Sequence, residues 1–177
     1  MDFVAIDVET ANRRRSSICQ IGLAFYEGGK LSGEWETYVN PREIFEWFNT
    51  KLHGIGQNTV KDAPDISKIS GKLYKYLDNR IVVCHTNFDQ AAISQAFAKY
   101  QLRTPGCTWM DSCRVARRTW EKVAVGSYGL NSLCTYLGYN FRHHDALEDA
   151  KAAGHIVVCA MQQTGLNVQE LLQYCRI

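Results

Sequence analysis

The sequence contains no apolar run of membrane-spanning length, and it does not open with a charged segment followed by an apolar one. We therefore expect a cytoplasmic protein without a membrane partner. An excess of charge of one sign is also absent, because the 20 lysines and arginines are nearly balanced by 18 aspartates and glutamates. With a net charge of +2 the chain is not a general polyanion binder, so any nucleic-acid site has to be a local basic patch.

The seven cysteines form no Cys-x-x-Cys pair, and most of them lie within apolar segments. An odd count without such pairs argues against a disulfide framework and against a structural zinc site. We expect reduced, buried thiols. A glycine-rich phosphate loop ending in lysine is also missing, which argues against a nucleotide triphosphatase.

The chain has 177 residues, of which 46% are hydrophobic and 21% charged, as is typical of a globular protein with a proper core. No repeat, linker or low-complexity segment interrupts the sequence. We expect a single domain covering residues 1–177.

The apolar pattern predicts an antiparallel meander followed by alternating strands and helices. Strands are expected at residues 3–10, 18–26, 31–40, 81–84 and 108–111, with Gly28-Gly29 as a hairpin turn. Helices are expected at residues 58–63, 65–77, 88–100, 112–118, 126–137, 146–163 and 168–175, with Asn58, Asp65 and Ser112 as N-caps. This order implies an α/β fold, in which a mixed sheet made of an antiparallel meander plus parallel strands carries helices on both faces.

Residues 41–56 are harder to assign, because Ile44, Phe45, Trp47 and Phe48 are too apolar for an ordinary exposed loop. Packing into the core is the favoured interpretation for most of them, and a stacking surface for nucleic-acid bases is the alternative.

Two basic clusters have the same two readings, a solvated surface or contact with phosphates. For the three consecutive arginines at 13–15 we favour phosphate contact, because they follow closely on a pair of acids. For Arg114, Arg117 and Arg118 we favour a solvated helix face.

Asp7 and Glu9 end the first predicted strand and lie two residues apart, so an extended backbone points both to the same face. Two carboxylates this close repel each other, and burial adds to the cost unless cations lie between them. Mg²⁺ or Mn²⁺, which prefer oxygen ligands, would satisfy the pair; two solvated loop acids are the alternative.

Two further acids stand at informative places. Asp89 follows the strand at 81–84, and the carboxyl ends of neighbouring parallel strands meet at one edge, so it would approach Asp7; helix capping is the alternative. Asp149 lies on the apolar stripe of the longest predicted helix, where a carboxylate needs a metal ion or a buried arginine as partner.

His144 precedes Asp149 by five residues and should project from the loop that leads into this helix, where Asp145 can cap. A neutral imidazole there could accept a proton from water near neutral pH. For the pair His143-His144, a surface turn is the alternative.

Three motifs in this order resemble those of the DEDDh 3′→5′ exonucleases, the group that includes the epsilon proofreading subunit of bacterial replicative DNA polymerase: Asp7-x-Glu9-Thr10, His85–Asp89 and His144-x-x-x-x-Asp149. Three spacers also look like the family's: Leu52-His53-Gly54-Ile55, Val60 with Ala63-Pro64, and Tyr128-Gly129-Leu130. The resemblance covers nearly the whole chain. The second motif is one residue shorter than in many members.

The resemblance implies a ribonuclease H-like fold and hydrolysis of the 3′-terminal phosphodiester of single-stranded DNA, with release of nucleoside 5′-monophosphates. It implies that two divalent cations, Mg²⁺ or Mn²⁺, bind to four acids: Asp7, Glu9, Asp89 and Asp149. His144 would be the general base, and the 3′-terminal nucleotide would contact Thr10, Ile55, His85 and Phe88. A polymerase or another repair protein is an expected partner.

Three other functions are weighed against this one. An exoribonuclease that trims RNA tails or oligoribonucleotides stays open, because nothing in the sequence visibly reads the 2′-hydroxyl. A non-catalytic nucleic-acid-binding module is disfavoured, because it would not need four intact acids. A two-carboxylate glycosidase is disfavoured, because no second acid pair is evident.

Overall fold

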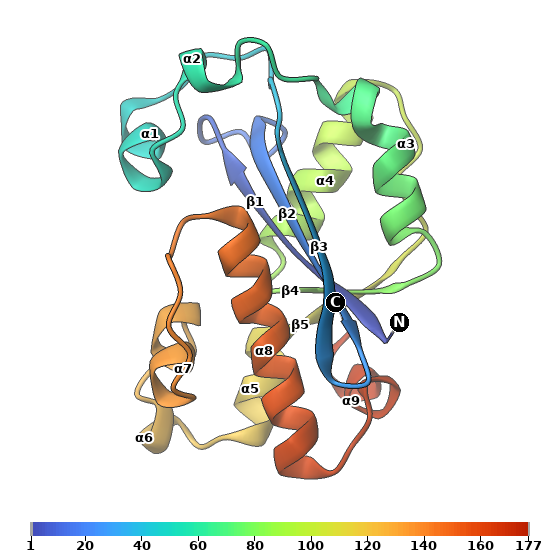
Figure 1. Ribbon diagram of the computed structural model, residues 1–177, viewed down its shortest axis with the longest axis vertical. Helices are drawn as coiled ribbons and strands as arrows, with labels where there is room; N and C mark the ends of the chain where they lie inside the picture. Colours follow the sequence, from blue (N-terminus) through green and yellow to red (C-terminus); the bar gives the residue numbers. More distant parts are fainter. Residues whose placement is uncertain (1, 177) are drawn as a thin grey trace.

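The computed structural model describes residues 2–176, and its centre is a five-stranded sheet with the strand order β3-β2-β1-β4-β5 (Figure 1). The strands are β1 (Phe3–Thr10), β2 (Ile18–Glu27), β3 (Lys30–Tyr38), β4 (Ile81–Cys84) and β5 (Thr108–Asp111). β2 runs antiparallel to β1 and β3, whereas β4 runs parallel to both β1 and β5. The mixed sheet predicted from the sequence is confirmed.

The meander closes through a two-residue turn between β2 and β3. Gly28 and Gly29 have φ angles of 57° and 70°, the left-handed conformation that tight hairpins need and that glycine adopts without strain.

Helices cover both faces of the sheet, as predicted. They are α1 (Trp47–His53), α2 (Gln57–Val60), α3 (Ile66–Leu77), α4 (Phe88–Lys99), α5 (Ser112–Thr119), α6 (Lys122–Val125), α7 (Leu130–Tyr136), α8 (Ala146–Thr164) and α9 (Val168–Cys175). Alternate residues of β1 supply two cores: Val4 and Ile6 pack with α3 and α4, while Phe3 and Ala5 pack with α5, α7, α8 and α9.

The start of α8 lies unusually close to β2. A Cβ atom on Gly22 of β2 would collide with the backbone of Ala146 and Leu147. Only glycine permits this approach, which fixes the first turn of α8 against the sheet.

Several predicted helix starts are wrong. The N-cap of α2 is Gly56 rather than Asn58, and that of α5 is Asp111 rather than Ser112. The Asp111 carboxylate accepts the first free N–H groups of α5, including that of Cys113, and a charged acceptor is favoured at a helix N-terminus. The helix expected from residue 126 begins at residue 130, and neither α1 nor α6 was predicted.

All seven cysteines are free, and the expected burial is confirmed for five of them, while Cys107 and Cys159 are only partly buried. Within residues 2–176, no helix combines the length and the apolar character needed to cross a bilayer.

Candidate active site

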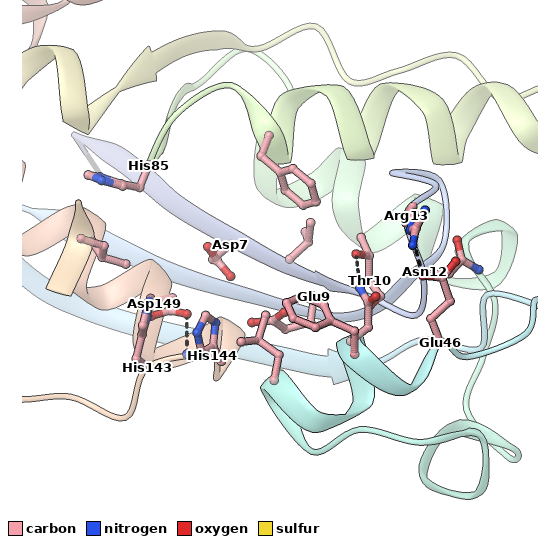
Figure 2. A pocket seen from close by; sticks show the side chains of 16 residues that line it. Asp7, Glu9, Thr10, Asn12, Arg13, Glu46, His85, His143, His144 and Asp149 are labelled. Carbon is pink, nitrogen blue, oxygen red and sulfur yellow. Dashed lines mark hydrogen bonds and ion pairs between the residues drawn. The ribbon is translucent and has the colours of Figure 1, made fainter. Parts of the chain in front are cut away.

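Carboxylates from β1 and α8 converge at the carboxyl end of β1 (Figure 2), and a third element, α4, adds one more beside them. Asp7 and Glu9 come from β1 and Asp149 from the first turn of α8, and one oxygen of each lies within 4.8 Å of the others. Asp89, in the first turn of α4, accepts a hydrogen bond of 3.0 Å from the N–H of Val8. The structure therefore brings the four acids expected from the sequence to the same strand end.

These acids border an open pocket with a volume of about 720 Å³. Thr10, His85, Phe88 and His144, all expected from the sequence to face substrate, also line this pocket, whereas Asp89 is buried behind its wall. The opening is large enough for a nucleotide.

Burial and mutual repulsion disfavour the ionised form of the acids. Burial, followed by the charges of Asp149 and Asp89, raises the pKa of Glu9 to about 8. Burial and the same neighbouring charges raise the pKa of Asp7 well above its ordinary value. Burial also raises the pKa of Asp89 to about 7, although the bond from Val8 opposes this. The site therefore carries more negative charge than the protein alone compensates.

The donor set fits divalent cations. Within the described part of the chain, His143 is the only basic side chain that contacts these four carboxylates, since Asp149 Oδ1 lies 2.8 Å from His143 Nδ1. Carboxylate oxygens without a lysine or arginine partner are the hard ligands that Mg²⁺ and Mn²⁺ prefer. Asp7, Glu9 and Asp149 could hold such an ion together, with Asp89 beside them.

The two neighbouring histidines make different contacts. His143 donates from Nδ1 to Asp149, whereas His144 bonds the same carboxylate through its backbone N–H at 2.9 Å. Among residues 2–176 the His144 ring has no hydrogen-bond partner, and it stacks on His143 with 3.9 Å between the ring centres. Burial, followed by the charge of His143, lowers the pKa of His144, so its imidazole is neutral at pH 7.

His85 lines the pocket, but both of its ring nitrogens are occupied. Nε2 donates to the carbonyl of Tyr128 at 3.0 Å, so Nδ1 accepts from the Ser112 hydroxyl at 2.8 Å. The next residue, Thr86, has a φ of 78°, and its N–H donates to the Asp111 carboxylate. The backbone therefore makes a left-handed turn within the second motif, directly after His85.

The expected location of Ile55 is wrong. Its side chain is buried in a small cluster with Ala11, Cys19 and Val60 rather than on the pocket wall. Gly54 has a φ of 79° and ends α1, so the chain turns inward just before Ile55.

α1 supplies pocket residues that the sequence did not reveal. Phe48, Asn49 and Leu52 line the pocket, and Asn49 Nδ2 donates to the carbonyl of Thr10 at 2.9 Å. His53, also in α1, contacts the same carbonyl through Nε2 at 3.1 Å. Two features of the sequence drew attention to this segment, the apolar residues between 44 and 48 and the family-like spacer at 52–55, but neither identified Asn49 as a pocket residue.

A family model described as Exonuclease (RNase_T) matches residues 4–157. The chain belongs to this exonuclease family. It is a DEDDh 3′→5′ exonuclease by its motifs, and hence a nuclease. Members of the family generally use divalent metal ions, in agreement with the acidic cluster.

Curated relatives contain a similar region within much longer chains. The DNA polymerase III PolC-type of Caldanaerobacter subterraneus subsp. tengcongensis is 30% identical over 166 residues, which is 92% of this chain but 12% of that protein. The 3′-5′ exonuclease DinG of Bacillus subtilis is 27% identical over 161 residues, or 87% of this chain and 17% of DinG. The chain thus spans less than a fifth of these relatives.

Solved structures share the fold. Exonuclease X, solved in complex with 5′-overhanging duplex DNA, superposes with a TM-score of 0.81 at 21% identity, covering 97% of this chain and 98% of that one. A 3′-exonuclease solved for its 3′-end-specific recognition of a histone mRNA stem-loop gives 0.74 at 18% identity, covering 92% and 64%. The ribonuclease H-like fold expected from the sequence is confirmed.

Proposed function

We propose that this exonuclease hydrolyses the 3′-terminal phosphodiester of single-stranded DNA and releases nucleoside 5′-monophosphates. The observation that carries the proposal is the meeting of Asp7, Glu9 and Asp149 within 4.8 Å at the wall of an open pocket, with Asp89 beside them.

Asp7, Glu9, Asp89 and Asp149 are the residues that would hold two divalent cations, Mg²⁺ or Mn²⁺. When bound, such cations neutralise the carboxylates and polarise phosphate oxygens and water. Two cations would balance a formal charge of about −4 on the four acids.

His144 is the proposed general base. Its unpartnered, neutral ring accepts a proton from the attacking water, whose oxygen forms a bond to phosphorus. The bond from phosphorus to the 3′-oxygen of the preceding nucleotide breaks, and that oxygen leaves as a hydroxyl after taking up a proton. The phosphate stays on the released nucleoside as its 5′-monophosphate.

The pocket walls would orient the terminal nucleotide. Thr10 and Phe88 contact it directly, while His85 holds the loop after β4 in place through its two hydrogen bonds. Leu52 takes the place on the pocket wall that was expected for Ile55.

The test is a degradation ladder on 5′-labelled single-stranded DNA and RNA of matched sequence, with Mg²⁺, with Mn²⁺ and with chelator. Metal-dependent shortening from the 3′ end, lost in His144→Ala and in Asp149→Asn, would support the proposal. The faster ladder names the substrate, so RNA as the better substrate would favour the exoribonuclease instead. The absence of any ladder with either metal would contradict both.

The similarity to PolC-type polymerases supports a second part of the proposal, a polymerase or another repair protein as partner. Co-elution of the chain with a replicative polymerase in size-exclusion chromatography tests it. Separate elution at micromolar concentrations would contradict it.

A further inference from the structure

Three large apolar side chains stand in solvent beside the pocket. The exposed fractions are 81% for Ile44, 72% for Trp47 and 67% for Phe48. The core packing favoured from the sequence is therefore wrong for these residues. Side chains of this size usually lie inside, and a group of them at the rim of a site indicates a binding surface.

The polar groups of the same segment attach it to the rest of the fold. Asn12 Nδ2 donates to the carbonyl of Ile44 at 2.9 Å, and the N–H of Glu46 donates to the carbonyl of Ala11 at 2.8 Å. Asn49 donates to the last carbonyl of β1. These contacts hold the backbone against the end of β1 while the apolar side chains face outward, so the surface is formed before anything binds.

The exposed surface meets the pocket at Phe48. Phe48 is one of the pocket's lining residues, and Trp47 precedes it at the start of α1. Ile44 borders an adjacent hollow that shares Asn12, Arg13 and Glu46 with the pocket. A chain whose end lies in the pocket can therefore continue over these side chains.

Cations accompany the apolar surface. The ammonium group of Lys51 lies 4.9 Å from the ring centre of Trp47, and the guanidinium of Arg15 lies 5.3 Å from that of Phe88. Arg14 is largely exposed at the same edge, where its Nη1 lies 4.0 Å from Glu43 Oε2. Flat apolar side chains interspersed with cations suit a polyanion that carries aromatic rings.

The acidic groups of this edge are already paired. Glu43 Oε1 lies 2.7 Å from Lys99 Nζ, and Glu46 Oε2 lies 3.3 Å from Arg13 Nε. They therefore offset little of the attraction that the remaining cations exert on phosphates.

We propose that Ile44, Trp47 and Phe48 form a stacking platform for the unpaired bases that immediately precede the 3′-terminal nucleotide. The inference rests on the proposed function and narrows its substrate to single strands, or single-stranded tails, several nucleotides long. Trp47 is the central contact, because its indole offers the largest flat face to a base.

The test compares wild type, Trp47→Ala and Trp47→Phe on three substrates: a dinucleotide whose 5′ residue lacks its base, a 12-mer, and a 12-mer lacking the bases at the second and third positions from the 3′ end. The readout is kcat/KM for removal of the 3′-terminal nucleotide. Tyr174→Ala is the matched control, because Tyr174 is an exposed aromatic residue on α9, at the other end of the molecule (Figure 1). Circular dichroism checks that every variant is folded.

Loss of one stacking contact should lower kcat/KM on the intact 12-mer about 5- to 100-fold, relative to the same variant's change on the dinucleotide. Trp47→Phe should recover part of this loss, and Tyr174→Ala should show none. Removal of the two bases should reduce the wild-type value similarly and make Trp47→Ala nearly harmless, because variant and substrate then lack the same contact.

If Trp47→Ala lowers kcat/KM equally on all three substrates, or does not lower it on the 12-mer, the inference is overturned. The exposed side chains would then be a surface for a protein partner. Both results presuppose that the wild-type chain removes 3′-terminal nucleotides. If it removes none from any substrate, the proposed function fails, and the stacking platform that rests on it is overturned with it.

Discussion

His143 and His144 are adjacent and their rings stack, yet their hydrogen bonds give them different chemistry. The Nδ1 proton of His143 is committed to Asp149, which keeps that carboxylate in place. The ring of His144 is left available to exchange a proton. Spacing pointed to His144 as the general base, and these contacts support the same proposal.

This division of roles predicts unequal effects of two matched substitutions. His144→Ala should lower kcat by about 10²- to 10⁴-fold with little change in KM, because a proton acceptor is lost and no substrate contact is. His143→Ala should cost less, since Asp149 keeps its bond from the His144 N–H. Single-turnover rates measure the effect of each substitution. A larger loss of rate in His143→Ala than in His144→Ala would indicate that His143, and not His144, is the general base.

Glu9 gives the metal-free protein a defined pH dependence. Its pKa rises from 4.5 to about 8 on folding, so the folded state prefers the protonated form. The stability associated with this group is present below pH 4.5 and is lost as the pH rises to about 8.

Glu9→Gln should remove this loss of stability at high pH, because glutamine cannot ionise. In chelator, the melting temperature of the variant should match wild type near pH 5 and exceed it at pH 8 by about 5 °C or more. Comparing variant with wild type at each pH cancels the opposing titration of the histidines. A difference independent of pH would show that Glu9 is not held in an unfavourable charged state. Added Mg²⁺ should narrow the gap, because the ion stabilises wild type more.

At the scale of elements, the contact between β2 and the start of α8 determines where Asp149 lies. Gly22→Ala should lower the free energy of unfolding by about 3 kcal/mol or more, because the new methyl group meets backbone that cannot rotate away. Activity should fall with it, since His144 and Asp149 move with the helix. Denaturant titration and kcat measure the two effects.

Gly71→Ala provides the control for that experiment. Gly71 is exposed in the middle of α3, and a Cβ atom there meets nothing within 4 Å. The same chemical change should therefore raise stability by about 0.5–1 kcal/mol through helix propensity. If both substitutions destabilise the protein, the collision with α8 is not the reason for the effect at Gly22.

Elements with a local apolar pattern were predictable from the sequence, and those defined by tertiary contacts were not. β4 and α9 have the predicted bounds, because a continuous apolar run and an N-capped amphipathic repeat are local signals. α1 was missed because its apolar side chains face solvent and its polar ones face the fold, the reverse of the usual pattern. Asn49 and Leu52 were not predicted as pocket residues for the same reason. The acids were predicted because carboxylates are unusual next to apolar strands.

For the molecule as a whole, β1 joins the two layers, because its alternate side chains belong to the two cores. Loss of either layer would expose the β1 side chains that this layer covers. We therefore propose that residues 1–177 unfold as one cooperative unit. Tryptophan fluorescence and far-ultraviolet circular dichroism should give the same midpoint in urea; separate midpoints would divide the chain into two domains.

The buried thiols can report local opening in different parts of the molecule. Cys84 lies in the core beneath α3 and α4, Cys134 and Cys175 in the core on the opposite face, and Cys19 in the small cluster beside α1. A thiol reagent can modify each of them only while the surrounding layer is open. Mass spectrometry of the modified peptides would report four opening free energies from the unmutated protein, and a smaller value at Cys19 would show that the segment carrying the exposed aromatic residues opens before the sheet does.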